Sequence, residues 1–296
     1  MSPAPSTRPR ASARAPRIQE ADVADELPSA GLDAGIRIGI GGWTYEPWRS
    51  NFYPEGLPQS RELPYASERL TAIEINGTYY RLQTPKTFAK WRDDTPGHFM
   101  FSLKAPRYAT NRRVLAEAGE AIEAFVGSGL TELGDKLGPI VWQFAPTKAF
   151  EPGDFEAFMR LLPRQAGRRE LRHVLDVRHP SFMAPEYLAL ARRHRLATVF
   201  ADSDEYPSFA DVTGDLVYAR LMKSQARLKT GYGPQAIDQW AGHAQAWAEG
   251  REPEGLPRVE PPAATQGPRR DVFIFFINGA KERAPAGAMA LLKRLG

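Results

Sequence analysis

The sequence of 296 residues contains no cysteine. This absence excludes disulfide scaffolds, thiolate zinc sites, iron–sulfur clusters and cysteine nucleophiles. Long apolar runs are missing as well, because the longest, residues 272–277, is far shorter than the roughly 20 residues of a membrane span. We therefore expect a soluble, cytoplasmic protein that does not enter a membrane.

A strong excess of charge is also absent, since 39 Lys and Arg residues face 35 Asp and Glu residues, a formal net charge of +4. An excess this small is compatible with an anionic ligand but does not identify a nucleic-acid-binding protein. The hydrophobic share of 42% and charged share of 25% are those of a globular chain. They exclude a collagen-like or wholly disordered protein, and the length suffices to bury a substantial core.

Residues 1–17 consist only of Met, Ser, Pro, Ala, Thr and Arg and lack the apolar stretch of a secretory signal. Such a segment cannot bury enough apolar surface to become ordered, so we expect a disordered basic, proline-rich tail over residues 1–35. The remaining residues, 36–296, are predicted to form one domain. Five prolines between residues 250 and 270 prevent a regular element there and predict a surface loop.

Between these segments, short apolar runs alternate with longer helical patterns. Eight runs rich in Ile, Val, Phe and Leu lack strict alternation, which is typical of strands covered on both faces. They span residues 36–40, 72–75, 99–103, 139–144, 173–177, 197–201, 216–221 and 272–277. Eight such runs over about 260 residues predict an α/β fold, a single (β/α)8 TIM barrel. A doubly wound open sheet is the rival, but Trp43 stands where its phosphate-binding turn would need another glycine.

Proline marks several helix starts, because its missing N–H would have no intrahelical partner in the first turn. We expect helices to begin near Pro85, Pro152, Pro185, Pro234 and Pro285. Apolar residues spaced by three and four predict one helical face around residues 115–125 and another around residues 237–247.

In such a barrel the active site is built at the C-terminal ends of the strands. Nearly every predicted strand ends in a residue that can form hydrogen bonds or carry charge, which predicts a ligand site there. The candidate residues for this site are Trp43, Tyr45, Glu74, Asn76, Tyr79, Lys104, Gln143, Asp176, Arg178, His179, Asp202, Arg220, Lys223 and Asn278.

Cations are prominent at these strand ends. Arginine suits bidentate recognition of carboxylate or phosphate, so Arg178 and Arg220 favour a small anionic ligand, phosphorylated or carboxylated. Lys104 is the best candidate for chemistry, since a pKa lowered by apolar neighbours and an arginine would permit proton transfer or Schiff-base formation. Its alternative role is an ion pair with Glu74 or Asp176. These two carboxylates are the candidate acid and base, and ion pairs without chemistry are the alternative.

Metal ligands are few. Of five histidines only His179 lies at a strand end, whereas barrel hydrolases that use metals need several histidines and carboxylates together. We therefore expect no metal and no cofactor, although the acids of strands two, five and six could hold one hard cation with His179. The alternative role of His179 is to cap a helix before Pro180.

Aromatic residues gather in the first two strand-end loops, namely Trp43, Tyr45, Trp48, Tyr53, Tyr79 and Tyr80. Such rings can stack a base or a sugar, and with arginines nearby they favour a nucleotide or nucleic-acid ligand. Packing of the loops onto the barrel is the alternative.

Several of these segments carry a family resemblance. Residues 41–58, which begin Gly-Gly-Trp-Thr-Tyr, and residues 74–81, Glu-Ile-Asn-Gly-Thr-Tyr-Tyr-Arg, resemble the first two motifs of the YecE-like family, also called domain of unknown function 72. Shorter motifs follow in the family's order at residues 101–106, 142–143, 178–182 and 218–221. The resemblance runs from about residue 36 to the C-terminus. It implies a TIM barrel but no reaction, because the activity of the family is unassigned.

The sequence departs from the family pattern within the expected site. Two expected histidines are replaced by Asn111 and Met222, and two expected asparagines by Ile277 and Gly287. The acid of the fifth strand, usually Glu, is the shorter Asp176. The resemblance therefore implies either a different substrate or impaired chemistry.

Three functions are open at this point, and whether the protein is an enzyme is one of the questions. The first is a metal-independent hydrolase or lyase that acts on an anionic substrate. The second is a non-catalytic binding module for a nucleotide or single-stranded nucleic acid. The third is a divergent barrel that has lost catalysis. The sequence leaves the substrate and the oligomeric state open.

Overall fold

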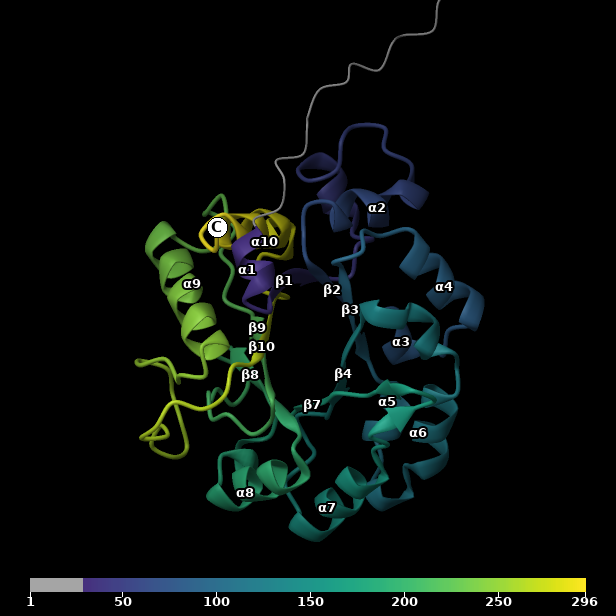
Figure 1. Cartoon of the computed structure of the whole chain (residues 1–296), viewed down its shortest axis with the longest axis vertical. Helices are drawn as coiled ribbons and strands as arrows, with labels where there is room; N and C mark the ends of the chain where they lie inside the picture. Colours follow the sequence, from purple (N-terminus) through teal and green to yellow (C-terminus); the bar gives the residue numbers. More distant parts are fainter. Residues whose placement is uncertain (1–28) are drawn as a thin grey trace, which may run out of the picture.

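The computed structural model describes residues 29–296, which contain a closed barrel of eight parallel strands (Figure 1). The strands are β1 (Ile36–Gly41), β2 (Ala72–Ile75), β3 (Met100–Lys104), β4 (Leu137–Gln143), β7 (His173–Asp176), β8 (Ala197–Asp202), β9 (Leu216–Leu221) and β10 (Asp271–Phe276). Their order round the barrel follows the chain, and β10 pairs with β1 to close it. The predicted (β/α)8 barrel is confirmed, and every predicted strand lies within two residues of an observed one.

Helices cover the outside of this barrel (Figure 1). The α-helices of the described residues are α1 (Ser29–Asp33), α2 (Glu62–Ser67), α3 (Gly77–Tyr80), α4 (Pro85–Asp93), α5 (Arg107–Thr110), α6 (Gly119–Val126), α7 (Pro152–Leu161), α8 (Pro185–His194), α9 (Pro234–Ala248) and α10 (Ala284–Leu292). The 3-10 helices are η1 (Glu46–Ser50), η2 (Gln59–Arg61), η3 (Leu115–Glu117), η4 (Leu130–Lys136), η5 (Pro180–Phe182) and η6 (Lys281–Arg283). A small antiparallel pair, β5 (Gln165–Ala166) and β6 (Arg169–Glu170), precedes β7.

Proline determines where the longer helices begin. The helices α4, α7, α8 and α9 start at the predicted prolines, and Pro285 is the second residue of α10. The side chains of Thr84 and Glu151, which precede two of these prolines, accept hydrogen bonds from amides in the first turns of α4 and α7. These caps satisfy N–H groups that have no partner within the helix.

The strands separate two apolar clusters. The inner cluster consists of Ala72, Val141, Val174, Ala197, Val199, Leu216, Tyr218, Phe273 and Phe275. The outer cluster lies between the strands and the helices, and the predicted apolar face of α9 is buried in it. Because side chains alternate between the two faces of a strand, this arrangement also decides which polar residues near the strand ends point into the barrel.

The predicted boundary of the N-terminal tail, at residue 35, lies too far along the chain. Residues 29–33 form α1, and the amide of Ala30 donates to the carbonyl of Gly296 (3.2 Å). Gly31 is buried against Leu295, close enough that an added Cβ would lie 3.3 Å from the leucine Cβ. One helical turn is too short to show apolar periodicity, which is why the sequence did not reveal it. The rest of the predicted tail, residues 1–28, lies outside the described residues.

The proline-rich segment of residues 250–270 has neither helix nor strand. Asp211 fixes it to the barrel, because its carboxylate accepts hydrogen bonds from the amides of Val259 (2.8 Å) and Glu260 (3.0 Å). The segment is therefore an irregular loop with a defined anchor. No helix among residues 29–296 has the length and apolar character to cross a membrane.

Candidate active site at the barrel mouth

Arg220 lies at the centre of the mouth, by which we mean the C-terminal ends of the eight barrel strands. It extends from β9 into the barrel and is 3% exposed. Its Nη2 lies 3.1 Å from Glu74 Oε1 on β2, and its Nη1 lies 2.8 Å from Asp176 Oδ2 on β7. Burial alone would lower the pKa of Arg220, but the two carboxylates raise it above its usual value. This arginine therefore joins both predicted acid–base residues across the barrel.

Arg178 extends this network outward. Its Nη2 lies 3.0 Å from Asp176 Oδ2 and donates to Gln143 Oε1 (2.9 Å). The amide of Gln143 lies 3.4 Å from the hydroxyl of Tyr79. Burial would raise the pKa of Asp176, but the guanidinium groups of Arg178 and Arg220 hold it below its usual value. Asp176 is therefore an anion that positions two arginines rather than a ready proton donor.

Two residues beneath this network were not predicted. The Tyr218 hydroxyl donates to Glu74 Oε2 (2.8 Å), and Ser102 Oγ lies 2.8 Å from the same hydroxyl. Burial and the charge of Glu74 raise the pKa of Tyr218 well above its usual value. Each lies two positions before a predicted site residue, Lys104 or Arg220, and so points to the same face of its strand. Strand alternation is the signal that would have found them.

Lys104 differs from its neighbours because its ammonium has no ion-pair or hydrogen-bond partner among residues 29–296. The residue is 7% exposed, and Nζ lies 4.4 Å from the centroid of the Tyr79 ring. Burial and the nearby charge of Arg220 lower the pKa of Lys104 to about 8, although Glu74 and Asp176 act in the opposite direction. The alternative expectation, a direct pair with Glu74 or Asp176, does not describe this geometry.

Lys281 is a fourth cation at the mouth, and sequence reasoning missed it. It belongs to η6 and its Nζ lies 4.7 Å from the centroid of the Tyr45 ring. Burial lowers the pKa of Lys281, and the charge of Glu74 opposes that shift. The only sequence signal is that Lys281 follows the predicted strand end at Asn278 by three residues. Around Arg220, four cations thus face the two carboxylates Glu74 and Asp176.

Three predicted residues form a second cluster at the ends of β8, β9 and β10. Lys223 Nζ lies 2.8 Å from Asp204 Oδ1 and 3.5 Å from Asp202 Oδ1. Tyr232 donates to Asp202 Oδ2 (2.9 Å). A cavity of about 370 Å³ is lined by Lys223 and Asn278, among others. No hydrogen bond between side chains of the described residues joins this cluster to the network around Arg220.

Other predicted residues have local structural contacts. His179 caps η5, because its Nδ1 accepts the amide of Ser181 (3.2 Å), as the alternative reading expected. Trp43 packs edge-on against Trp91, with ring centroids 5.5 Å apart. The side-chain amide of Asn76 lies against the backbone of Gly41 and has no hydrogen bond within the described part of the chain.

The aromatic residues of the first two strand-end loops differ in burial. Trp48 is fully buried and Tyr53 is 5% exposed, and Tyr45 packs edge-on against Trp48 (5.2 Å). Trp48 and Tyr53 therefore pack the first loop onto the barrel, and Lys281 lies over the ring of the partly buried Tyr45. Tyr80, by contrast, is 66% exposed.

The positions that depart from the family pattern have particular surroundings. A Cβ at Gly287 would lie 2.7 Å from both the Phe276 ring and the Thr230 carbonyl, so α10 lies too close to the barrel for an asparagine side chain. Met222 lines the same cavity as Lys223. Asn111 follows α5 and is exposed, and Ile277 packs against the inner cluster.

Metal-ligating side chains do not converge in the described residues, where no group of three or more His, Asp or Glu could hold an ion. Of the carboxylates that a hard cation would need, Glu74 and Asp176 already bind Arg220, and Asp202 binds Lys223 and Tyr232. The donor set at the mouth therefore suits a guanidinium better than a metal.

Comparison with known proteins agrees with the fold and with the predicted resemblance. The family model described as protein of unknown function DUF72 matches residues 37–296. UPF0759 protein YecE of Escherichia coli (strain K12) is 27% identical over 149 residues, 50% of this chain and 50% of that protein. UPF0759 protein YunF of Bacillus subtilis (strain 168) is 25% identical over 157 residues, 51% and 54% of the two. The chain thus spans about half the length of the curated relatives it matches.

A solved structure shares the fold. The crystal structure of a DUF72 family protein, TM1631 from Thermotoga maritima MSB8, has a TM-score of 0.63 and 20% sequence identity. The match covers 88% of this chain and 97% of that one. An identity this low supports the barrel architecture and no particular reaction.

Proposed function

This chain belongs to the DUF72 family of proteins of unknown function, and from that premise we propose that the barrel mouth is a metal-independent active site whose reacting group is the amine of Lys104. Its substrate is a small phosphorylated or carboxylated molecule that carries a carbonyl group. The sequence favours a hydrolase or a lyase, and the reaction proposed here is that of a lyase.

The observation that carries this proposal is the isolation of Lys104. The two carboxylates nearest to it are bound by arginines, so the buried ammonium has no charged partner in residues 29–296. A largely buried ammonium without a partner shifts toward its neutral form, and burial together with the charge of Arg220 lowers the pKa of Lys104 to about 8. A neutral lysine amine is a nucleophile near physiological pH, whereas a paired lysine is not.

The chemistry follows from that amine. The lone pair of Lys104 Nζ adds to the substrate carbonyl carbon, and loss of water gives a protonated imine. Cleavage of the bond between the adjacent carbon and its substituent sends the electron pair toward the iminium nitrogen, and the substituent leaves as carbon dioxide or, when its hydroxyl loses a proton to water, as an aldehyde. The group left on Lys104 is a neutral enamine, which takes a proton from water on the adjacent carbon and becomes an imine again. Water then hydrolyses this imine, which releases the second product and restores the amine. In this scheme Glu74 and Asp176 hold Arg220 and Arg178 in position, and neither carboxylate transfers a proton to or from the substrate.

The charge at the mouth supports an anionic substrate. Lys104, Lys281, Arg178 and Arg220 are four cations set around two carboxylates. A phosphate or carboxylate bound there would offset the excess positive charge, and arginine can hold it through charge-assisted hydrogen bonds. Such binding also brings the substrate carbonyl close to Lys104, which is the positioning that an amine nucleophile needs.

Pyridoxal 5′-phosphate is a suitable probe because it is an anionic aldehyde that forms imines with reactive lysines. The protein is incubated with it, reduced with borohydride and digested, and the labelled lysine is identified by mass spectrometry. We expect Lys104 to be labelled first, with labelling that rises as the pH passes through about 8 and falls when inorganic phosphate is added. Pyridoxal, which lacks the phosphate, should label it more slowly.

Three variants make the test specific. Lys104→Met should remove the rapid labelling, Lys281→Met should reduce its phosphate dependence, and Lys136→Met should change neither. Lys136 is the matched control, because burial also lowers its pKa but its Nζ donates to the Thr95 carbonyl (2.6 Å). Equal labelling of many exposed lysines, or none at Lys104, would overturn the proposal.

A further inference from the structure

One side of the mouth has an unusual composition. The loops after β2 and β3, residues 76–84 and 105–114, contain no Asp or Glu. The Thr78 hydroxyl holds the first of these loops against the end of β3 by donating to the Lys104 carbonyl (2.7 Å), and α3 and α5 lie on the same side of the barrel in Figure 1. We call this surface the basic rim, and its arginines and tyrosines are Arg81, Arg107, Arg112, Arg113, Tyr79, Tyr80 and Tyr108.

Two neighbouring tyrosine rings lie between two cations along the rim. Lys104 Nζ lies 4.4 Å from the Tyr79 ring centroid, and Tyr79 packs edge-on against Tyr80 with centroids 5.2 Å apart. The guanidinium of Arg107 lies 5.7 Å from the Tyr80 centroid. The row runs from the buried Lys104 to Tyr80, which is 66% exposed. Tyr108 is a second open ring, 39% exposed.

The rim arginines are open to an outside anion. Arg81, Arg107 and Arg113 are exposed, and none of them forms an ion pair with another residue of the described chain. Arg112 donates to the Tyr108 carbonyl (2.9 Å), which holds the loop but neutralises no charge. Arginine without a protein carboxylate is well suited to phosphate.

We propose that the basic rim binds single-stranded nucleic acid, with phosphates on Arg81, Arg107 and Arg113 and a base stacked on Tyr80. Phosphate contacts and aromatic stacking together are the way in which proteins hold single strands with little sequence preference. A duplex hides the faces of its bases, so the exposed tyrosines favour a single strand. The inference goes beyond the proposed function, because binding on the rim does not need the amine of Lys104.

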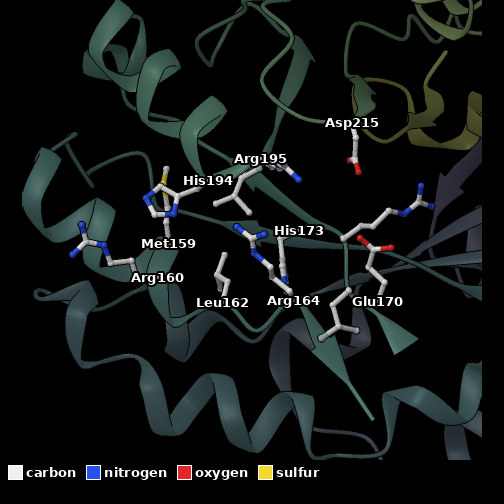
Figure 2. Close-up of a pocket in the computed structure, with 12 residues that line it drawn as sticks. Met159, Arg160, Leu162, Arg164, Glu170, His173, His194, Arg195 and Asp215 are labelled. Carbon is white, nitrogen blue, oxygen red and sulfur yellow. The ribbon is translucent and has the colours of Figure 1, made fainter. Parts of the chain in front are cut away.

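The opposite end of the barrel offers a control surface. A cavity of about 330 Å³ there is lined by Arg164 and Arg195, and Figure 2 shows both with Glu170 and Asp215 around the same cavity. Neither arginine forms an ion pair among residues 29–296. Tyrosine, tryptophan and phenylalanine are absent from the lining residues. Together with the exposed Arg168, these two arginines give a set of three to compare with Arg81, Arg107 and Arg113 of the rim, in surroundings that differ in aromatic content and local charge.

The test measures fluorescence anisotropy of a labelled mixed-sequence oligonucleotide of about 12 nucleotides, a length within the site sizes of single-strand binders. Binding of the single strand and of the duplex to the wild-type protein is measured at low and at moderate salt. We expect the single strand to bind more tightly. The rim variant Arg81→Gln/Arg107→Gln/Arg113→Gln should weaken it at least about tenfold and lower its salt dependence. Tyr80→Ala should weaken it by about 5- to 100-fold, as loss of one stacked base predicts.

The control variant Arg164→Gln/Arg168→Gln/Arg195→Gln removes the same charge and should leave binding unchanged. Equal losses of affinity in the rim and control variants would mean that binding follows net charge. Equally tight binding of duplex, with no effect of Tyr80→Ala, would mean that no base stacks on Tyr80. Either result overturns the inference. The rim variant should keep pyridoxal-phosphate labelling of Lys104. Failure of the rim and failure of the proposed chemistry are therefore distinguishable.

Discussion

Arginines gather at both ends of the barrel, but their burial and their ion pairs differ. At the mouth, Arg220, Glu74 and Asp176 are nearly inaccessible and pair with one another. At the N-terminal end, the arginines around the cavity of Figure 2 are largely exposed, and Arg172 pairs with the half-exposed Asp271. The number of charges is therefore a poor guide to a functional site, and their burial separates the two ends.

The buried titratable group of the N-terminal end is His173, and both of its nitrogens have partners. Nδ1 accepts from Trp142 Nε1 (3.0 Å), so Nε2 carries the hydrogen and donates to the Pro163 carbonyl (2.7 Å). Burial lowers the pKa of His173 to about 4. This ring is a satisfied structural group. Lys104 at the mouth is also buried but lacks a partner, and the proposal of chemistry at the mouth rests on that contrast.

The largest expected effect is loss of the mouth's central cation. Arg220→Met leaves Glu74 and Asp176 buried without their shared counter-charge, and we expect the free energy of unfolding to fall by about 3–5 kcal/mol. Arg172→Met is the matched variant at the other end, where solvent screens the remaining Asp271, and should cost under about 1 kcal/mol. Denaturant unfolding of both variants measures the difference. Equal costs would mean that the mouth network is no more buried in solution than the surface pair.

The next effect concerns pH at the N-terminal end. The folded-state pKa of His173, about 4, lies below the unfolded value of 6.5, so the unfolded chain binds a proton that the folded chain rejects. The contribution of neutral His173 to the free energy of unfolding is fully present above pH 6.5. It should fall by about 3 kcal/mol as the pH drops to 4. His173→Phe cannot titrate, so its stability should decline less over this range. Parallel curves of unfolding free energy against pH would contradict the assignment.

Unlike Arg220→Met, the substitution Lys104→Met should raise the free energy of unfolding. Its folded-state pKa of about 8 lies below the usual 10.5, so below pH 8 the fold must bury a charge that the unfolded chain exposes to water. We expect the variant to be more stable by about 3 kcal/mol at pH 7, a gain that disappears as the pH rises from 8 to 10.5. Denaturant unfolding across this pH range gives the measurement. A destabilised variant would show that the ammonium has a partner after all.

The smallest expected effect is at Lys223, in the second cluster of the mouth. Lys223 pairs with Asp202 and Asp204 through a side chain that is 40% exposed. We expect Lys223→Met to cost under about 1 kcal/mol and the cost to shrink further in high salt. A loss as large as that of Arg220→Met would place the second cluster in the same buried network. Unfolding at two salt concentrations decides between these outcomes.

The sequence by itself determined the architecture and the end of the barrel at which the candidate site lies. Strands buried on both faces must be continuously apolar, so eight apolar runs were readable directly. Prolines marked the helix starts because of a local property of the backbone. Parallel strands point the same way, so their polar C-terminal residues had to share one face. These features depend on neighbours in the chain, which the sequence contains.

Only the tertiary structure decided how the charges pair. Glu74, Asp176 and Arg220 lie on strands that are far apart in sequence, and whether Lys104 or Arg220 reaches the carboxylates depends on distances across the barrel. The same distances placed Lys281 at the mouth, beside the Tyr45 ring. A difference of a few ångströms decides whether a buried amine is paired or neutral, because charge interactions in a poorly solvated interior change steeply with distance and burial. Sequence position fixes the direction of a side chain but not that distance.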